Sequence, residues 1–478
     1  MSITETRPVP TSRPPLKQPP GPAGLFSYPK RFLEYSRDPL TYLRRLAREY
    51  GDVVLLQSFG MPFYMFNHPD HIEEITRRQH RFFKKDFFIE SLRPLLGNGL
   101  LTSEGEEWRR QRAMAQPAFQ AKQIQQYAAT MVAFTQKMLA TWKPDQSADL
   151  HHEMMRLTAQ IVTKTLFDAD VNDDEGSIGK DLEIAMTFYA NPLAMWPAWR
   201  YVPTPTNLRF TRTLKRLNAI IYQLIGERRA TGTAGRTDLL SRLLEAADED
   251  GKKMSDTELR DQLMTLFLAG HETTALTLTF AFYLLAQDAA AEAKLHAEID
   301  RVLGDRPPTS DDVAKLTFAE WVIKESMRLY PPAWTIGREA LEDCEIGGYQ
   351  VRKGTQLLMS QWVVHRDPRF WNEADRFHPD RWGEEATKNL PRCAYFPFGD
   401  GPRICIGSSF AMMEAILLLA TIVQRYRLEL VKGQELHLVP SVTMRPRDGV
   451  QMIPRDRSAS RSATVGAVHS AKIQVATT

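Results

Sequence analysis

The loop around Cys405 carries the strongest chemical signal in the sequence. Cys405 lies in the segment FPFGDGPRICIGSSFA, residues 396–411. A buried cysteine thiolate that binds a metal ion needs hydrogen-bond donors for its charge, a backbone that can approach closely and shelter from water. Gly401 and Gly407 permit tight, left-handed backbone. A helix expected to begin near Ser408 directs the positive end of its dipole toward the sulfur. The segment is therefore suited to hold a thiolate metal ligand.

Two further side chains support this interpretation of the loop. Phe398 can cover the sulfur, and Arg403 can reach an acidic group of a cofactor on the same side. Most lone cysteines are small buried hydrophobic residues, and that alternative applies to Cys405 when it is considered alone. The combined spacing Phe-x-x-Gly-x-Arg-x-Cys-x-Gly, however, resembles the haem-binding loop of the cytochrome P450 family. The resemblance implies haem b as the cofactor, with Phe398, Arg403 and Gly407 beside it and Cys405 as the axial ligand of the iron. Such a thiolate favours cleavage of the O–O bond.

A second group of polar residues interrupts an apolar helical pattern at residues 269–274, AGHETT. Burial of an unpaired carboxylate such as Glu272 is costly, so the group is either a polar cluster tolerated in a long helix or a functional notch. It resembles the Ala-Gly-x-Asp/Glu-Thr-Thr motif of the family. The resemblance implies that Thr273 holds bound oxygen, that Glu272 helps to deliver protons, and that Gly270 loosens the same turn. We expect His271 to neighbour this site without being a ligand.

Glu325 and Arg328 stand three residues apart and share one face of a predicted helix. Alone, the pair is a weak signal. Because LYPP follows it, the pair resembles the Glu-x-x-Arg motif of the family, and Arg381 in FHPDRW matches the arginine that completes that network. Mutual bidentate hydrogen bonds satisfy such a buried set. We assign the three residues to folding and to positioning of the haem loop.

Trp108 and Arg112 lie one helical turn apart in EEWRRQR, a pattern that also suits a basic, solvated helix face. The resemblance implies instead that both residues meet the haem propionates. Arg338 and Arg403 match further propionate-binding arginines of the family. Three arginines facing two carboxylates balance the charge of a buried site.

The elements that must position these residues follow from periodicity and from helix start signals. A capping box from Ser255 to Glu258 begins the longest predicted helix, which continues to about Gln287. A helix of roughly 30 residues is about 45 Å long and crosses a whole domain. Patterns before Arg328 are mainly helical, and short strands and proline-rich loops follow Pro331. Further predicted elements are a helix at 39–50, a hairpin of strands at 53–56 and 62–66, and a helix at 408–425.

One large domain is expected over residues 25–455, because no internal repeat and no linker-like segment divides it. Its class is mainly α with small β-sheets (α+β). The resemblance, which spans the same residues, implies the cytochrome P450 fold, with a long central helix over the haem and a β-rich lobe at one side. Residues 1–24 form a proline-rich arm without an apolar run, so we expect neither a signal peptide nor a transmembrane anchor. Residues 456–478 are expected to be a disordered tail.

The composition is that of an ordinary globular protein. The chain has 478 residues, of which 43% are hydrophobic and 25% charged, and its net charge is +3. This balance argues against nucleic acid as a partner. The three cysteines match neither a disulfide framework nor a zinc motif, which indicates a reducing compartment and a cytoplasmic location. Cys344 and Cys393 are expected to be ordinary thiols.

Three stretches, 82–101, 182–201 and 332–336, are expected over the distal pocket because of the resemblance. Their apolar side chains belong more commonly to a protein core, but as pocket residues they predict an apolar ligand with few fixed polar contacts. We expect a fatty acid or another long lipid as the substrate, with a terpenoid or steroid as the alternative. The candidates are Phe87, Phe88, Ile89, Leu95, Leu96, Met186, Phe188, Tyr189, Met195, Trp196, Trp199, Tyr201 and Trp334.

These features predict a monooxygenase that inserts one atom of O2 into an apolar substrate. Electrons are expected from a separate ferredoxin or flavodoxin and its NAD(P)H-dependent reductase. Arg109 and Arg110 could steer such an acidic donor if they stay exposed. A monomer is expected. A haem-thiolate isomerase or dehydratase and a non-catalytic haem sensor are alternatives, which the intact Glu272–Thr273 pair disfavours. An electron-transfer cytochrome is less favoured, because no Cys-x-x-Cys-His occurs.

Overall fold

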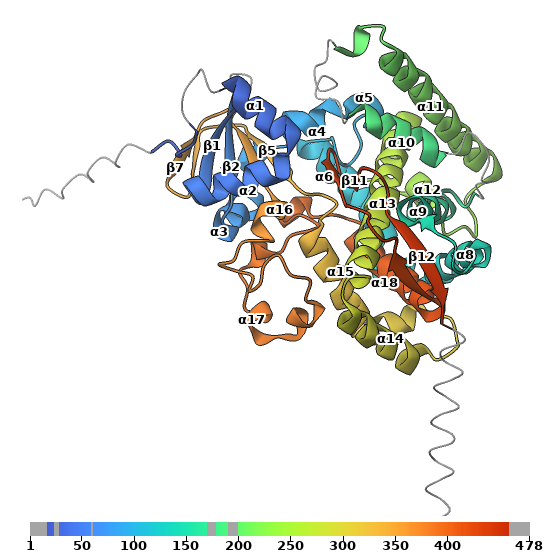
Figure 1. Ribbon diagram of the computed structural model, residues 1–478. Helices are drawn as coiled ribbons and strands as arrows, with labels where there is room; N and C mark the ends of the chain where they lie inside the picture. Colours follow the sequence, from blue (N-terminus) through green and yellow to red (C-terminus); the bar gives the residue numbers. More distant parts are fainter. Residues whose placement is uncertain (1–16, 23–27, 59–60, 170–177, 190–198, 458–478) are drawn as a thin grey trace, which may run out of the picture.

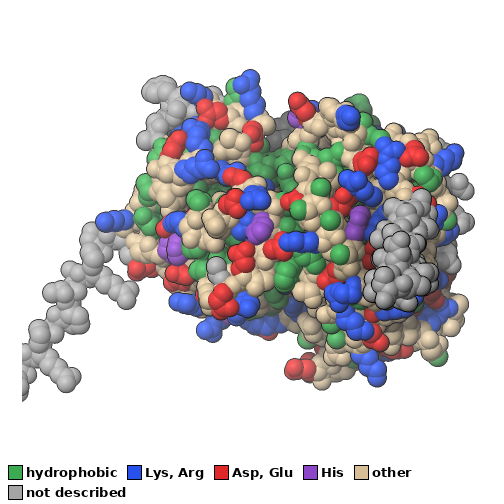
Figure 2. All heavy atoms as spheres, turned by 60° about the horizontal axis from the view of Figure 1, so that its bottom comes forward, with side chains coloured by type: hydrophobic (Ala, Val, Ile, Leu, Met, Phe, Trp, Pro, Cys, Tyr) green, Lys and Arg blue, Asp and Glu red, His purple; other side chains and the backbone are tan. Residues whose placement is uncertain are grey.

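The computed structural model describes residues 17–22, 28–58, 61–169, 178–189 and 199–457. A β-rich lobe lies beside a larger helical region, and the lobe combines strands from the first hundred residues with strands from residues 336–359 (Figure 1). The expected class, mainly α with small β-sheets, is confirmed. On the face shown in Figure 2, acidic and basic side chains are interspersed among the described residues without a continuous patch of one sign.

A five-stranded sheet with the order β1-β2-β8-β5-β3 forms the β-rich lobe. β1 (Val53–Ser58) and β2 (Met61–Phe66) make the predicted antiparallel hairpin. β8 (Gln356–Met359) runs parallel to β2 and antiparallel to β5 (Ile336–Ala340), and β5 pairs with β3 (Phe83–Lys84). The sheet therefore holds the residues that follow β3 beside a strand from the second half of the chain.

The helical region is organised around α13 (Asp256–Leu285), a helix of 30 residues that runs through the centre of Figure 1. The predicted capping box at its start is present. Buried residues occur on all its faces, as expected for a helix that neighbours surround. Those neighbours are α9 (Leu150–Phe167), α11 (Pro205–Thr231), α15 (Thr317–Leu329) and α18 (Ser408–Arg425).

The remaining elements are short or lie at the periphery. The other α-helices are α1 (Tyr28–Arg37), α2 (Pro39–Tyr50), α3 (Pro69–Glu73), α4 (Phe87–Ser91), α5 (Arg93–Leu96), α6 (Gly105–Ala115), α7 (Ala121–Gln125), α8 (Ala128–Thr141), α10 (Ile178–Phe188), α12 (Leu239–Glu245), α14 (Ala289–Leu303), α16 (Gln361–Val364) and α17 (Glu385–Lys388). The other strands are β4 (Ala148–Asp149), β6 (Cys344–Ile346), β7 (Tyr349–Val351), β9 (Tyr426–Leu430), β10 (Leu438–Pro440), β11 (Met444–Pro446) and β12 (Gln451–Asp456). Single turns of 3-10 or π-helix are η2 (Glu74–Arg78), η3 (His80–Phe82), η4 (Gln116–Phe119), η6 (Trp199–Tyr201), η7 (Ser310–Lys315), η8 (Pro379–Gly383), η9 (Arg392–Ala394) and η10 (Gly401–Arg403).

α18 is the one helix of the described chain that is long and apolar enough to cross a membrane. The run from Met413 to Val423 is buried without interruption. It packs against α8, α13 and α15 in the largest hydrophobic core of the described residues. Its composition is therefore explained by burial inside the fold.

Glu325 lies on α15 with no exposed surface and forms a buried ionic network. Its carboxylate accepts hydrogen bonds from Arg328 at 2.8 and 2.9 Å and from Arg381 at 2.9 Å. The backbone N–H of His378 and the indole N–H of Trp382 donate to it at 3.1 Å each. The remaining N–H groups of both arginines donate to backbone carbonyls in the long loop after α16. The network therefore joins α15 to this loop.

We expect Glu325→Gln to lower the free energy of unfolding by roughly 3–5 kcal/mol, because it leaves two buried guanidinium groups without their anion. Glu320→Gln on the same helix is the control, since Glu320 pairs with Lys324 near the surface, where such pairs contribute about 1 kcal/mol or less. Urea unfolding followed by circular dichroism measures both variants. Equal losses in the two variants would contradict the role assigned to the network.

Candidate active site

Cys405 lies within the short loop, residues 404–407, that joins η10 to α18. Its N–H donates to Phe398 O at 2.9 Å, so the phenylalanine and the cysteine are held together. Gly401 has a φ of 69°, and a Cβ there would lie 1.9 Å from Thr76 O, so this position requires glycine. Gly407 has a φ of −90°. The expectation of left-handed backbone is therefore right for Gly401 and wrong for Gly407.

The side chain of Cys405 is open to an internal cavity. Burial raises the pKa of its thiol, while the backbone N–H of Gly407 and the guanidinium of Arg112 lower that pKa in part. α18 begins at Ser408 and adds the positive end of its dipole. These groups favour the thiolate, and a metal cation facing the sulfur would complete its stabilisation.

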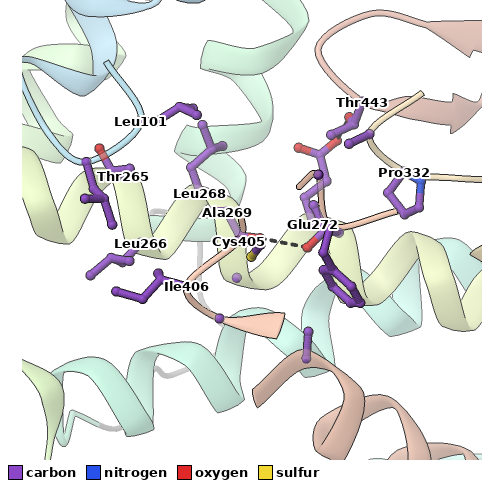
Figure 3. Close-up of a pocket in the computed structure, with 18 of the residues that line it drawn as sticks. Leu101, Thr265, Leu266, Leu268, Ala269, Glu272, Pro332, Cys405, Ile406 and Thr443 are labelled. Atoms are coloured by element: carbon purple, nitrogen blue, oxygen red, sulfur yellow. Dashed lines mark hydrogen bonds between the residues drawn. The ribbon is translucent and has the colours of Figure 1, made fainter. Parts of the chain in front are cut away.

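The cavity has a volume of about 400 Å³ and lies between α13 and the Cys405 loop (Figure 3). This is within the range of roughly 300–1,000 Å³ that ligand pockets occupy. Most of its wall is apolar and comes from α13, α9, α10 and the segments before α6 and after Cys405. The apolar residues include Leu100, Leu101, Val162, Leu166, Met186, Leu266, Leu268, Pro332 and Ile406.

The Ala-Gly-x-Glu-Thr-Thr segment forms the wall of α13 opposite the sulfur. Thr273 Oγ1 donates to Ala269 O at 2.7 Å, and Thr274 Oγ1 donates to Gly270 O at 3.3 Å, as expected for helical threonines. A Cβ on Gly270 would lie 3.3 Å from Val162 Cγ2, so glycine relieves the contact with α9. All four of these α13 residues line the cavity. The structure thus brings Thr273 and Gly270 to the same space as Cys405.

Glu272 also lines the cavity, and its carboxylate is directed toward Thr443 (Figure 3). Its Oε1 accepts hydrogen bonds from Thr443 Oγ1 and Arg445 Nε. Sequence reasoning missed both partners. His271 is absent from the cavity wall; it is buried, with its ring against Phe267.

The four residues expected to meet haem propionates all line the same cavity. The guanidinium of Arg403 lies 3.9 Å from the centre of the Trp108 ring. Arg112 Nη1 donates to Ile404 O at 2.7 Å, which places it beside the cysteine loop. Burial lowers the pKa of Arg338, and it lowers the pKa of Arg403 to about 10.

Lys85 is a further cation of this cluster, and sequence reasoning missed it. Its side chain lines the cavity, and burial together with the charges of Arg338 and Arg403 lowers its pKa to about 7. Glu104 pairs with Arg403 and Asp86 lies near Arg338, but burial raises the pKa of Asp86. The cluster therefore carries positive charge beyond its own carboxylates. It suits a ligand with two anionic groups, as the propionates of a haem provide.

Arg109 and Arg110 differ in their surroundings. Arg109 is exposed and pairs with Glu106 on its own helix. Arg110 is mostly covered and pairs with Asp248 and Glu258. The expectation that both stay exposed for an acidic electron donor is therefore wrong for Arg110, because two carboxylates from distant segments already neutralise it.

Part of the expected substrate side lines the cavity, namely Phe88, Ile89 and Met186. Met195 and Trp196 lie outside the described residues. The other candidates do not line it: Phe87, Leu95, Leu96, Phe188, Tyr189, Trp199, Tyr201 and Trp334. Apolar periodicity cannot distinguish a face toward the core from a face toward a cavity. Phe188, for example, stacks on Phe210 with ring centres 4.2 Å apart.

Glu414 on α18 is a buried carboxyl group that sequence reasoning did not single out. It has no exposed surface, and neither of its oxygens has a hydrogen-bond partner among the described residues. Burial raises its pKa to about 8, with Thr274 as the nearby hydroxyl that lowers it in part. It is therefore a neutral acid at pH 7, placed between α18 and the α13 notch.

The fold and this site define a haem-thiolate protein of mainly helical architecture, and comparison with known proteins gives its family. Residues 19–453 match the cytochrome P450 family. Cyclooctatin synthase from Streptomyces melanosporofaciens is 37% identical over 433 residues, which are 88% of this chain and 92% of the relative. Cyclooctat-9-en-7-ol 5-monooxygenase from the same organism is 37% identical over 84% of this chain and 87% of its own length. Pentalenene oxygenase from Streptomyces avermitilis is 34% identical over 85% of this chain and 91% of its own length.

A solved structure agrees with these relatives. The haem domain of cytochrome P450DA superposes with a TM-score of 0.84 at 30% sequence identity, covering 92% of this chain and 98% of that one. The chain belongs to the cytochrome P450 family. It is a monooxygenase that uses haem b and O2, with electrons supplied by a redox partner.

We expect Cys405→Ser to abolish the red-shifted ferrous–CO absorption band that marks thiolate ligation of haem, because serine does not provide a thiolate. Cys344→Ser is the control, since Cys344 lies half-buried in the β-rich lobe, where burial raises the pKa of its thiol to about 11. The spectra of reduced, CO-treated proteins decide the outcome. Retention of the band in Cys405→Ser would assign the ligand elsewhere.

We expect Lys85→Met to speed the loss of haem by roughly tenfold, which corresponds to about 1.4 kcal/mol. The substitution removes an amine that two propionates would keep protonated on that side of the cavity. Lys84→Met is the matched control, because Lys84 pairs with Glu90 and Glu339 outside the cavity. Transfer of haem to an excess of an acceptor protein gives the rates. Equal rates of haem loss in the two variants would show that Lys85 does not help to hold the haem.

Proposed function

We propose that this monooxygenase hydroxylates an unactivated C–H bond of a terpenoid. The observation that carries the proposal is the likeness, over most of both chains, to relatives whose names specify terpenoid products or substrates, such as pentalenene oxygenase. The expected fatty-acid substrate has less support than the terpenoid alternative. The monooxygenase names of the relatives also disfavour an isomerase, a dehydratase or a haem sensor.

The charges around the cavity support the same choice. The described cations that line it are Lys85, Arg112, Arg338 and Arg403, which form the cluster suited to propionates. Arg445 lies behind Glu272 and is bonded to it. A fatty-acid carboxylate would therefore find no unengaged cation on the described substrate side. A hydrocarbon or a terpene alcohol has no such requirement, and the apolar wall suits it.

The proposed reaction assigns a separate role to each group of residues. When bound, the haem supplies the binding and reduction of O2 and the cleavage of its O–O bond. Cys405 would hold the haem through its thiolate, and Phe398 and Gly407 flank its sulfur. Thr273 would supply protons to the cavity through its hydroxyl, with Glu272 as the acid that replenishes them. The apolar wall excludes water and directs the substrate.

Electrons come, on this proposal, from a ferredoxin or flavodoxin with an NAD(P)H-dependent reductase. The enzyme acts as a monomer in the cytoplasm. Arg109, which among the described residues pairs with Glu106 on its own helix, remains a candidate contact for an acidic donor.

A binding and turnover screen tests the substrate class. We expect terpene hydrocarbons and terpene alcohols to shift the haem absorption band of the purified holoenzyme and to yield monohydroxylated products with a surrogate ferredoxin system. Long-chain fatty acids should give weaker shifts and at least roughly tenfold less product. Hydroxylation of fatty acids alone would overturn the terpenoid assignment.

A further inference from the structure

One wall of the cavity is a loop whose backbone is held by side chains of α13. This α5–α6 loop, residues 97–104, contributes Leu100 to the lining. Asn98 N–H donates to Asp261 Oδ2 at 2.7 Å, and Leu100 N–H donates to Gln262 Oε1 at 3.1 Å. Both acceptors are buried side chains of α13. The position of this wall therefore depends on two side chains of a helix to which the wall does not belong.

Two glycines let the loop lie directly against α13. Gly97 has a φ of 62°, and a Cβ there would lie 2.0 Å from Asp261 Oδ1. A Cβ on Gly99 would lie 2.3 Å from Thr265 Oγ1 and 2.5 Å from Asp261 O. The loop is thus as close to the helix as its backbone permits. Leu101, which follows, lies on the side of the cavity that Thr265 marks in Figure 3.

Arg260 fixes Asp261 and joins it to two further elements. Its Nη1 donates to Asp261 Oδ1 at 2.8 Å, and its Nη2 donates to Leu95 O on α5 at 2.8 Å. Its Nε donates to Asn218 Oδ1 on α11 at 2.7 Å. The side chains of Arg260 and Asp261 are 8% and 10% exposed. Because charge-assisted hydrogen bonds are strong, the carboxylate that receives Asn98 is held in one geometry.

The far side of the loop is bound to α6. Gln111 Nε2 donates to Asn98 O at 2.8 Å, and Ser103 Oγ donates to Gln111 Oε1 at 2.7 Å. Gln111 has no exposed surface. Loss of the bonds to α13 would therefore let the loop shift about its attachment to α6 without detaching it from the protein.

We propose that Arg260, Asp261 and Gln262, here called the anchor, are positioning residues that limit the bulk of the substrate that the cavity admits. The inference rests on the proposed function for its substrate class, because the anchor would select among terpenoids by size. Leu100 and Leu101 form the apolar surface of the loop toward the cavity. While the anchor holds the loop against α13, a bulkier skeleton cannot displace these two side chains. Without the anchor, the loop yields and this part of the cavity widens.

Imidazoles that bind haem iron test the anchor whatever the natural substrate is. Imidazole, 4-phenylimidazole and clotrimazole increase in bulk in that order, and the shift of the haem absorption band gives their dissociation constants with the purified holoenzyme. We expect Asp261→Ala to lower the dissociation constant of clotrimazole, divided by that of imidazole, by roughly tenfold or more. Tenfold is the lower end of the discrimination that one methylene gives in an apolar pocket.

Two further variants decide the question should Asp261→Ala fail to fold. Gln262→Met removes the acceptor of Leu100 N–H and leaves no buried charge unpaired, so it should lower the same ratio by a smaller factor. Gly99→Ala leaves the anchor intact and displaces the loop from its own side, because the added Cβ meets Thr265. It should lower the ratio as well.

Two matched controls should keep the wild-type ratio. Asp256→Ala removes a carboxylate from the start of the same helix, where Asp256 pairs with Arg229 at the surface. Gly226→Ala adds a Cβ that meets no atom within 4 Å on α11.

The outcomes separate the inference from the proposed function. Absence of terpenoid turnover in the wild-type enzyme would overturn the proposed function, and the ratio for the imidazoles would still be measurable. The thiolate-type CO band and the midpoint of urea unfolding identify the variants that retain haem and fold. In those variants, a ratio equal to that of the controls, as a general loosening of the structure would give, or a higher ratio would overturn the inference.

Discussion

The position of the Cys405 sulfur inside the protein, facing an internal cavity, is the constraint from which most of this structure follows. A thiol in a site of low dielectric constant resists ionisation, and burial accordingly raises the pKa of this one. Three groups near the sulfur favour its ionised form, namely the N-terminus of α18, the N–H of Gly407 and the guanidinium of Arg112. The haem then brings its own negative charges, for which the cationic cluster around Arg338 is placed on the same cavity. Each positive charge thus lowers the cost of burying a neighbouring negative charge, whether that of the thiolate or of a propionate.

Such a site needs a rigid support, because a misplaced cation or sulfur would be both buried and unpaired. The Glu325 network provides this support at a distance. It fixes α15 to the loop after α16, which leads on to the cysteine segment, and it does so with a carboxylate that accepts five N–H bonds. α15 and α18 also pack against α13 in one core. Residues 269–274 of α13 and the sulfur of Cys405 are thereby held on opposite sides of the cavity, and the packing of the core determines the distance between them.

Sequence reasoning was most effective where function restricts local spacing. The cysteine loop, the α13 motif with its capping box and the Glu-x-x-Arg pair are short patterns, and the structure brings Cys405, Thr273 and the expected arginines to one cavity. The substrate side was predicted poorly, because Leu95 or Phe188 on an apolar helix face serves the core and a pocket equally well. The position of Lys85 on the cavity could not be predicted, because a Lys-Lys-Asp run is typical of an exposed surface. Arg110 was misjudged because its partners, Asp248 and Glu258, are more than a hundred residues away.

The position of Glu272 shows why such distant partners matter for chemistry. Its motif identifies an acid, yet the motif alone leaves open where the carboxylate points. That direction depends on Thr443 and Arg445, which follow it by 171 and 173 residues. The turn between the two strands of that hairpin also lines the cavity, so the same short segment contacts both the cavity and Glu272. A substitution in this hairpin would therefore change the cavity wall and the partners of Glu272 together, while the residues of the Cys405 loop stay the same.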